Sequence, residues 1–262
     1  MKRIAVPIPV RMFSLALSFV FVSACAVNVP APKTGATAPA ADPQTAWSNV
    51  LSKYVDPNGK IDFLGLSKDR SDLDAYVAWI GSVSPAKTPA SFPTKDAKLA
   101  YYINAYNALA MYNVLESGMP KDLNAVKVRF FYRNKLALGG EKMSLYDLEN
   151  KIIRPMGDPR VHFALNCMVR GCPRLPREAF RADQLDMELE ATAQYFLNED
   201  RNVQVDASKE TVRFSEILKF YTDDFLKKAP SLAAYANKYR ESKIPETYKV
   251  EFIPYDWTLN QR

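Results

Sequence analysis

The order of helical and strand-like segments most constrains the fold of this chain. Apolar periodicity predicts a long helix near Ala97–Ser117, which Gly118 closes. Short strand-like runs at 203–205 and 211–214 predict a hairpin, and the tail at 248–257 is extended and aromatic. These segments do not alternate regularly as in a parallel α/β fold. We expect an α+β fold, a single mixed domain of several helices on a small, largely antiparallel sheet, of the papain or transglutaminase kind.

Three further segments carry strand signals. The runs 126–132 and 135–138 are predicted as strands, with a Gly-Gly turn after the second. The segment Arg160–Asn166 is also predicted as a strand. Alternation then turns His162 and Asn166 toward one face, opposite the apolar residues between them.

The N-terminus reads as a targeting segment. A basic start precedes an apolar run of 13 residues, Met12–Ala24, which is too short to span a bilayer as a helix. The small residues before Cys25 resemble a bacterial lipobox, although ordinary signal cleavage also fits. We expect a signal peptide over 1–25 with Cys25 lipidated, and a disordered Ala/Pro-rich tether over 26–44. One globular domain then occupies 45–262.

These segments predict an exported lipoprotein that faces the periplasm and contacts a membrane through its lipid, with soluble periplasmic export as the alternative. The net charge of +6 falls to +3 when the three cations of the signal peptide are removed, and no basic run remains. We expect no nucleic-acid partner. The nine glycines are scattered and form no phosphate loop, so no cofactor is predicted.

The chain contains one histidine, His162. Any imidazole catalysis must use it, and structural zinc sites with several histidines are excluded. Cys167 and Cys172 follow within ten residues, with four residues between them. In an oxidising compartment the two cysteines either form a disulfide or leave a reactive thiol.

Polar residues interrupt two apolar helix patterns. Glu149 falls on an apolar stripe, where it either orients a catalytic group or pairs with Arg154 or Arg160. Asn104 and Asn107 share one face of the long helix, where they either act in a site or bridge buried backbone.

The first hypothesis is a thiol-dependent hydrolase or acyltransferase. Cys172 is the nucleophile, His162 the base, and Glu149 or Asn104 the orienting group. Pro173 suggests that Cys172 precedes a helix, whose N-terminus lowers the thiol pKa. The substrate is an unidentified peptide or small molecule, and the candidate binding residues are those around this pair: Tyr102, Asn107, Arg160, Asn166 and Cys167. No metal ligands are predicted.

Two alternatives remain open at this stage. The first is a non-catalytic binding or scaffold lipoprotein in which Cys167 and Cys172 form a structural disulfide. The second is a dithiol redox protein, which the spacing of four residues disfavours because thioredoxin-like motifs have two.

Several motifs together resemble the domain of unknown function 547 family. They are the runs 102–109 (YINAYNAL), 144–149 (SLYDLE) and 162–167 (HFALNC) with Cys172-Pro173, and two later ones, 220–225 and 254–260. The resemblance covers roughly Trp47 to Asn260, with a family core of about 97–226. Where the family pattern has a histidine after the glutamate, this chain has Asn150. The family includes exported bacterial proteins and plant proteins with glutaredoxin-like or leucine-zipper regions, which implies redox or scaffold roles by association.

Overall fold

The structure is a computed structural model that describes residues 26–32 and 43–262. The expected signal peptide, Cys25 and the part of the tether over 33–42 lie outside the described residues. Among the described residues, no helix combines the length and the apolar character needed to cross a membrane.

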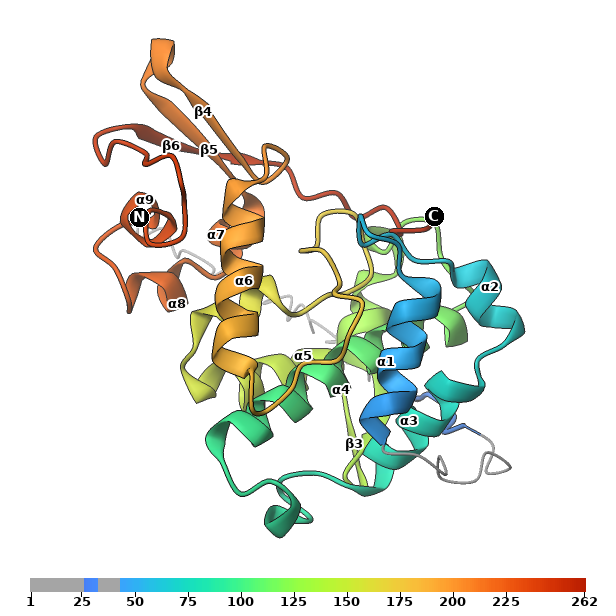
Figure 1. Cartoon of the computed structure of the whole chain (residues 1–262). Coiled ribbons are helices and arrows are strands. Elements are labelled where there is room, and N and C mark those ends of the chain that lie inside the picture. The colour runs from blue at the N-terminus through green and yellow to red at the C-terminus, as the bar shows by residue number, and fades with distance from the viewer. Residues whose placement is uncertain (1–25, 33–42) are drawn as a thin grey trace, which may run out of the picture.

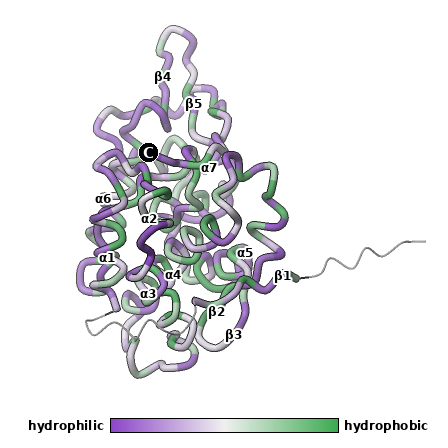
Figure 2. Tube along the Cα trace, turned by 90° about the vertical axis from the view of Figure 1, so that its right-hand side faces the viewer, coloured by the Kyte–Doolittle hydropathy of each residue, from purple (hydrophilic) through white to green (hydrophobic). Residues whose placement is uncertain are grey.

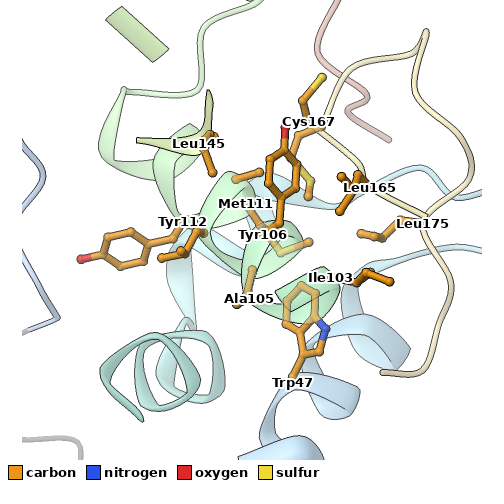
Figure 3. Packing of buried hydrophobic residues seen from close by; sticks show 14 of the residues in the cluster. Trp47, Ile103, Ala105, Tyr106, Met111, Tyr112, Leu145, Leu165, Cys167 and Leu175 are labelled. Atoms are coloured by element: carbon orange, nitrogen blue, oxygen red, sulfur yellow. The ribbon is translucent and has the colours of Figure 1, made fainter. Parts of the chain in front are cut away.

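Helix α4 (Lys95–Glu116) lies at the centre of the molecule, as the long helix predicted from the sequence (Figure 1). The Thr94 side chain caps it by accepting a hydrogen bond from the backbone N–H of Ala97 at 3.0 Å. Every residue from Leu99 to Val114 is buried, so the helix is enclosed on all sides. Figure 3 shows the cluster around it, with Trp47 of α1 packed on one side and Leu145 on another.

Three N-terminal helices cover one side of α4: α1 (Pro43–Tyr54), α2 (Phe63–Lys68) and α3 (Ser71–Ser82). The rings of Trp47 and Tyr76 stack at 5.7 Å and join α1 to α3. Figure 2 shows the hydrophobic stretches concentrated around α4 and α5, inside more hydrophilic segments.

A first sheet has the order β1-β2-β3, from Val27–Asn28, Asn134–Leu138 and Glu141–Met143. The strand predicted at 135–138 is therefore present as β2. Strand β1 belongs to the expected tether, but it pairs with β2 in parallel. The adjacent Val29 is buried, and Pro30 accepts a hydrogen bond from the Tyr112 hydroxyl at 2.8 Å. Residues 26–32 are thus not a free spacer, because backbone pairing and burial hold them on the domain.

A second sheet has the order β4-β5-β6, from Val203–Asp206, Thr211–Ser215 and Lys249–Ile253. The β4–β5 hairpin is the one predicted, and it projects from the body in Figure 1. The tail enters as β6, parallel to β5. The α+β class is confirmed, but in place of one largely antiparallel sheet the described residues form two three-stranded sheets, each with one parallel and one antiparallel pair.

Residues of β4 and β5 share a hydrophobic cluster with the helices α6 (Leu185–Asn198), α7 (Glu216–Phe220), α8 (Thr222–Leu226) and α9 (Leu232–Ala236). Phe163 of the preceding segment belongs to this second cluster, and its ring stacks on that of Phe225 at 5.5 Å. Tyr255 packs against both hydrophobic clusters of the molecule.

Two predicted strands are helical turns. The run at 126–132 forms η2 (Asn124–Val126) and the π-helical η3 (Arg129–Arg133), where Phe130 is buried while Val128 and Tyr132 are exposed. Further short turns are η1 (Pro89–Ser91) and η7 (Ala207–Lys209).

The run at 160–166 begins as the 3-10 turn η6 (Pro159–Phe163), which Asp158 caps by accepting from the N–H of Arg160. Residues 161–169 are all buried, so this segment has no exposed face. An alternation of polar and apolar residues therefore does not identify a strand here. His162 and Asn166 consequently do not share a sheet face. Before this turn the chain forms α5 (Leu145–Asp147), η4 (Leu148–Ile153) and η5 (Arg154–Met156).

Candidate active site

A cavity of about 360 Å³ lies where residues of the two hydrophobic clusters meet. Its buried lining residues are Tyr106, Glu149, His162, Leu165, Cys167, Cys172, Pro173 and Ile217. Its exposed lining residues are Tyr132, Tyr146 and Phe220, which are aromatic. The cavity therefore has a polar, sulfur-bearing floor and an aromatic mouth, a composition typical of small-molecule sites.

The side chain of Asn166 shapes the loop that carries both cysteines. Its Nδ2 donates to the carbonyl of Pro173 at 2.7 Å, and its Oδ1 accepts from the N–H of Met168 at 2.7 Å. Met168 adopts a left-handed φ of 73°, which reverses the chain inside this loop. The loop is thus closed on itself, and the two sulfurs face each other.

The sulfurs of Cys167 and Cys172 are 3.2 Å apart, and both cysteines are free thiols in this structure. The Cys172 sulfur also accepts from the backbone N–H of Cys167 at 3.1 Å. It lies 3.1 Å from the hydroxyl of Tyr255. The Cys167 sulfur lies 3.6 Å from the same hydroxyl.

The two thiols are electrostatically unequal. Burial disfavours a thiolate at Cys172, but hydrogen bonds from the Cys167 thiol and the Tyr255 hydroxyl outweigh it and lower the pKa of Cys172 to about 7. The hydrogen bond to Cys172, together with burial, raises the pKa of Cys167 well above its usual value. One thiolate is therefore stabilised by a protonated neighbour.

No helix begins at Cys172, contrary to the sequence-based expectation. Residues 171–184 contain no helix, and α6 begins only at Leu185. Two prolines close together, Pro173 and Pro176, prevent regular backbone hydrogen bonding in this stretch. The low pKa of Cys172 therefore depends on four specific hydrogen bonds, from the Cys167 thiol, the Tyr255 hydroxyl and the backbone of Val169 and Cys167, and not on a helix dipole.

The C-terminal segment brings Tyr255 to the thiols. The N–H groups of Arg170 and Gly171 donate to the carbonyls of Thr258 and Asp256 at 2.9 and 2.8 Å, which aligns the two segments. A Cβ on Gly171 would lie 2.8 Å from the ring of Tyr255, so only glycine permits this approach.

Glu149 is 7% exposed and forms no ion pair with Arg154 or Arg160. Its carboxyl accepts hydrogen bonds from two phenols, Tyr106 at 3.3 Å and Tyr221. Burial, followed by the charge of Glu149, raises the pKa of both phenols well above the usual value, so both remain protonated donors. In Figure 3 the hydroxyl of Tyr106 points from α4 toward Cys167.

His162 makes its hydrogen bond away from the thiols. Its Nε2 lies 3.0 Å from Oδ2 of Asp224, and Arg154 donates to the same oxygen at 2.7 Å. The imidazole stacks on Tyr221 at 3.7 Å. Burial lowers the pKa of His162 although Asp224 opposes this, so the ring is neutral at pH 7. Its Nδ1 finds no hydrogen-bond partner within 26–32 and 43–262, so His162 shares the cavity with Cys172 without a hydrogen bond to it.

The asparagines of α4 bridge buried backbone. Asn104 donates to the carbonyl of Phe180 at 2.8 Å and accepts from its N–H at 3.0 Å. Asn107 does the same between the carbonyl of Ala164 and the N–H of Asn166, at 3.0 and 2.8 Å. The nitrogen and the oxygen of each amide are thus both bonded to backbone, and Asn104 forms no hydrogen bond with His162.

The remaining predicted residues lie outside the cavity. Tyr102 is buried, with its ring 5.2 Å from that of Tyr101. Arg160 forms ion pairs with Asp158 at 2.8 Å and Asp186 at 2.7 Å, which fasten η6 to α6. Of the predicted residues, Cys167, Cys172, His162 and Glu149 thus line one cavity, and the others support the fold around it.

Sequence reasoning assigned no role to Tyr106, Tyr221, Asp224 or Tyr255. A signal was present, because three of them lie in the motifs at 220–225 and 254–260 that contribute to the family resemblance. Within 26–32 and 43–262, no group of three or more His, Cys, Asp or Glu side chains could hold a metal ion.

The fold and cavity define an α+β protein with a buried pair of thiols. Residues 90–197 match the family model described as "Protein of unknown function, DUF547", which supports the resemblance drawn from the motifs. The matched segment includes both thiols, Glu149 and His162, and ends before Tyr221 and Tyr255. No curated protein and no solved structure shows significant similarity to the chain.

Proposed function

We propose that this protein is a thiol oxidoreductase that exchanges its Cys167–Cys172 dithiol with small disulfides. One observation carries the proposal: the two sulfurs are 3.2 Å apart on the cavity floor, with a pKa of about 7 for Cys172 and a raised pKa for Cys167. A disulfide exchange pair needs one thiolate at ambient pH and one protonated partner within bonding reach. The structure thus favours a function that the spacing of the cysteines alone disfavoured.

The reaction follows from these positions. The Cys172 thiolate attacks one sulfur of the substrate disulfide, whose S–S bond breaks and releases the first thiolate. The Cys167 sulfur then attacks Cys172 and displaces the second substrate sulfur, which takes the Cys167 proton. The substrate gains two electrons and becomes two thiols once the first thiolate is protonated by water. The protein keeps a Cys167–Cys172 disulfide, which an external thiol reduces.

Burial limits the substrate size. Cys172 is 3% exposed and Cys167 is 9% exposed, and both are reached through a cavity of about 360 Å³. This volume is near the lower end for small-molecule sites, about 300–1,000 Å³. The structure therefore favours small disulfides over disulfides held in folded proteins.

Trapping of the covalent intermediate tests this function. In Cys167→Ser the second displacement is blocked, so a small aromatic disulfide should leave a stable mixed disulfide on Cys172, visible by intact mass. Cys172→Ser should trap far less at the same pH, because burial still raises the pKa of the remaining thiol after the hydrogen bond to Cys172 is removed. Equal trapping at both positions, or none at Cys172 with a folded variant, contradicts the proposal.

Acyl transfer at Cys172 is the second candidate function. The observation in its favour is that a neutral His162, held by Asp224, lines the same cavity. Its weakness is the absence of a hydrogen bond between His162 and the thiol. An activated ester separates the two functions. Acyl transfer should survive in Cys167→Ser and be lost in His162→Gln, whereas turnover of a disulfide should stop in Cys167→Ser after the first displacement.

We also propose that the protein is an exported lipoprotein anchored through Cys25, on the sequence features of residues 1–25 alone. Labelled palmitate should enter the full-length chain expressed in a bacterium and be absent from Cys25→Ser. Labelling of neither chain, together with a cytoplasmic location, contradicts export and anchoring.

A further inference from the structure

We propose that the cavity selects disulfides and thiols that carry a carboxylate, which Lys127 binds at the mouth. This inference rests on the proposed thiol chemistry for its reaction but on separate observations for its charge selectivity. These observations are the charge balance of the lining residues and the form of the mouth.

The charged lining residues are Lys127, Glu149 and Arg154. Arg154 is paired with Asp224, with 2.7 Å between Nε and Oδ2, and Lys227 binds the other oxygen of the same carboxylate at 2.9 Å. Glu149 is held by two phenol donors. Lys127 forms no ion pair within 4.0 Å in the described part of the chain. The nearby carboxyl of Glu216 feels its charge but is paired with Lys219 at 3.0 Å, so Lys127 is the lining cation that has no ion-pair partner among the described residues.

The position of the Lys127 ammonium is fixed without its charge being neutralised. Nζ lies 4.2 Å from the centroid of the Trp257 ring, a cation–π contact. An aromatic face satisfies one side of the ammonium and leaves donors free for a second partner. The same turn of chain carries Arg129 and Arg133, both exposed and without an ion pair among the described residues, which adds to the positive potential.

The aromatic mouth accommodates the carbon chain between the anion and the sulfur. The rings of Tyr132 and Tyr146 lie 4.6 Å apart and are 45% and 41% exposed. The ring centroids of Phe131 and Trp257 lie 6.1 Å apart in an edge-to-face arrangement, and Trp257 is the ring that Lys127 contacts. A ligand with a carboxylate at Lys127 can thus extend along aromatic faces toward Cys172. A cationic or neutral ligand of equal shape lacks the ionic contact.

Two alkylating reagents of nearly equal size test the charge selectivity without any disulfide chemistry. Two rates of Cys172 alkylation are measured, one with iodoacetate and one with iodoacetamide. The ratio of the first rate to the second is then divided by the same ratio for free cysteine. Both reagents consume the same thiolate, so the ratio reports the field of the cavity. We expect a normalised ratio of about two to five at low salt, because this range corresponds to the free energy that a half-exposed ion pair contributes.

Lys127→Gln should return this ratio to about one, and added salt should lower it in the wild type. The matched control is Lys68→Gln, which removes an equal charge from an exposed position on α2 that does not line the cavity. A wild-type ratio at or below one, or an equal loss in both variants, overturns the inference.

Dithiodipropionate and its neutral diamide then test the selectivity on substrates. The wild type should be oxidised faster by the dianion, again by about two- to fivefold after normalisation to a model dithiol, and Lys127→Gln should lose the preference. If both disulfides oxidise the protein equally, the charge selectivity fails while the proposed function stands. If neither reacts but iodoacetate is preferred, the proposed function fails and the anion site stands.

Discussion

The hydrogen bond from Tyr255 to Cys172 permits a quantitative prediction. Removing the hydroxyl in Tyr255→Phe leaves the ring, its packing and the cavity walls in place. The lost contact is a 3.1 Å hydrogen bond to a buried thiolate. Hydrogen bonds to charged groups contribute about 1.5–3 kcal/mol, and about 1.4 kcal/mol corresponds to a tenfold change in the ionisation constant. Since Cys167 still supplies donors, the lower end applies, and the pKa of Cys172 should rise from about 7 to about 8.

The assay is the pH profile of Cys172 alkylation by iodoacetamide, mapped by peptide mass. The midpoint of the profile is the readout, because a more basic thiolate is intrinsically more nucleophilic and partly offsets the loss of thiolate at neutral pH. Tyr146→Phe is the matched control, since this phenol lines the cavity and makes no contact with either sulfur. An unchanged midpoint in Tyr255→Phe, or a wild-type midpoint at the value of an ordinary thiol, refutes the reasoning.

Three further predictions address the support of the site. Gly171→Ala places a methyl group 2.8 Å from the ring of Tyr255, so the ring must move. The alkylation midpoint of Cys172 should then rise as in Tyr255→Phe, and an unchanged midpoint contradicts the packing argument. Asn104→Ala leaves the buried N–H and carbonyl of Phe180 unpaired, so the free energy of unfolding in urea should fall by about 2–4 kcal/mol. The alkylation midpoint of Cys172 should stay unchanged, and a shifted midpoint would give Asn104 a role at the site. Folding lowers the pKa of Asp224 below 3.8, so its contribution to stability is present at neutral pH and lost as the pH falls through and below about 4. Asp224→Asn should therefore be less stable than the wild type at pH 7, with a difference that shrinks on acidification, and a difference that grows contradicts the assignment.

Local sequence signals predicted the elements whose boundaries are marked, such as a hairpin between turn residues and a long helix that Gly118 closes. The β4–β5 hairpin shows this, and the predicted span of α4 was close to the observed Lys95–Glu116. The segment 160–166 failed because residues 161–169 are buried throughout. Without a solvent face, apolar content cannot separate a strand from a 3-10 turn.

Part of the site was predictable because some of its residues are close together in the sequence. The proximity of His162, Cys167 and Cys172 in sequence placed them near one another in space. Their contacts could not be read from spacing, because Tyr255 arrives from 83 positions beyond Cys172 through the pairing of the C-terminal segment. The partner of His162, Asp224, is 62 positions away and equally non-local.

The reduction potential of the Cys167–Cys172 pair tests the central claim most directly. The purified protein is equilibrated in graded dithiothreitol redox buffers, quenched with acid and alkylated. The fraction of oxidised protein is then measured by intact mass spectrometry. An exchange pair should show one reversible two-electron transition between about −270 and −120 mV. A transition below about −300 mV, which marks a structural disulfide, or thiols that never join, contradicts the claim.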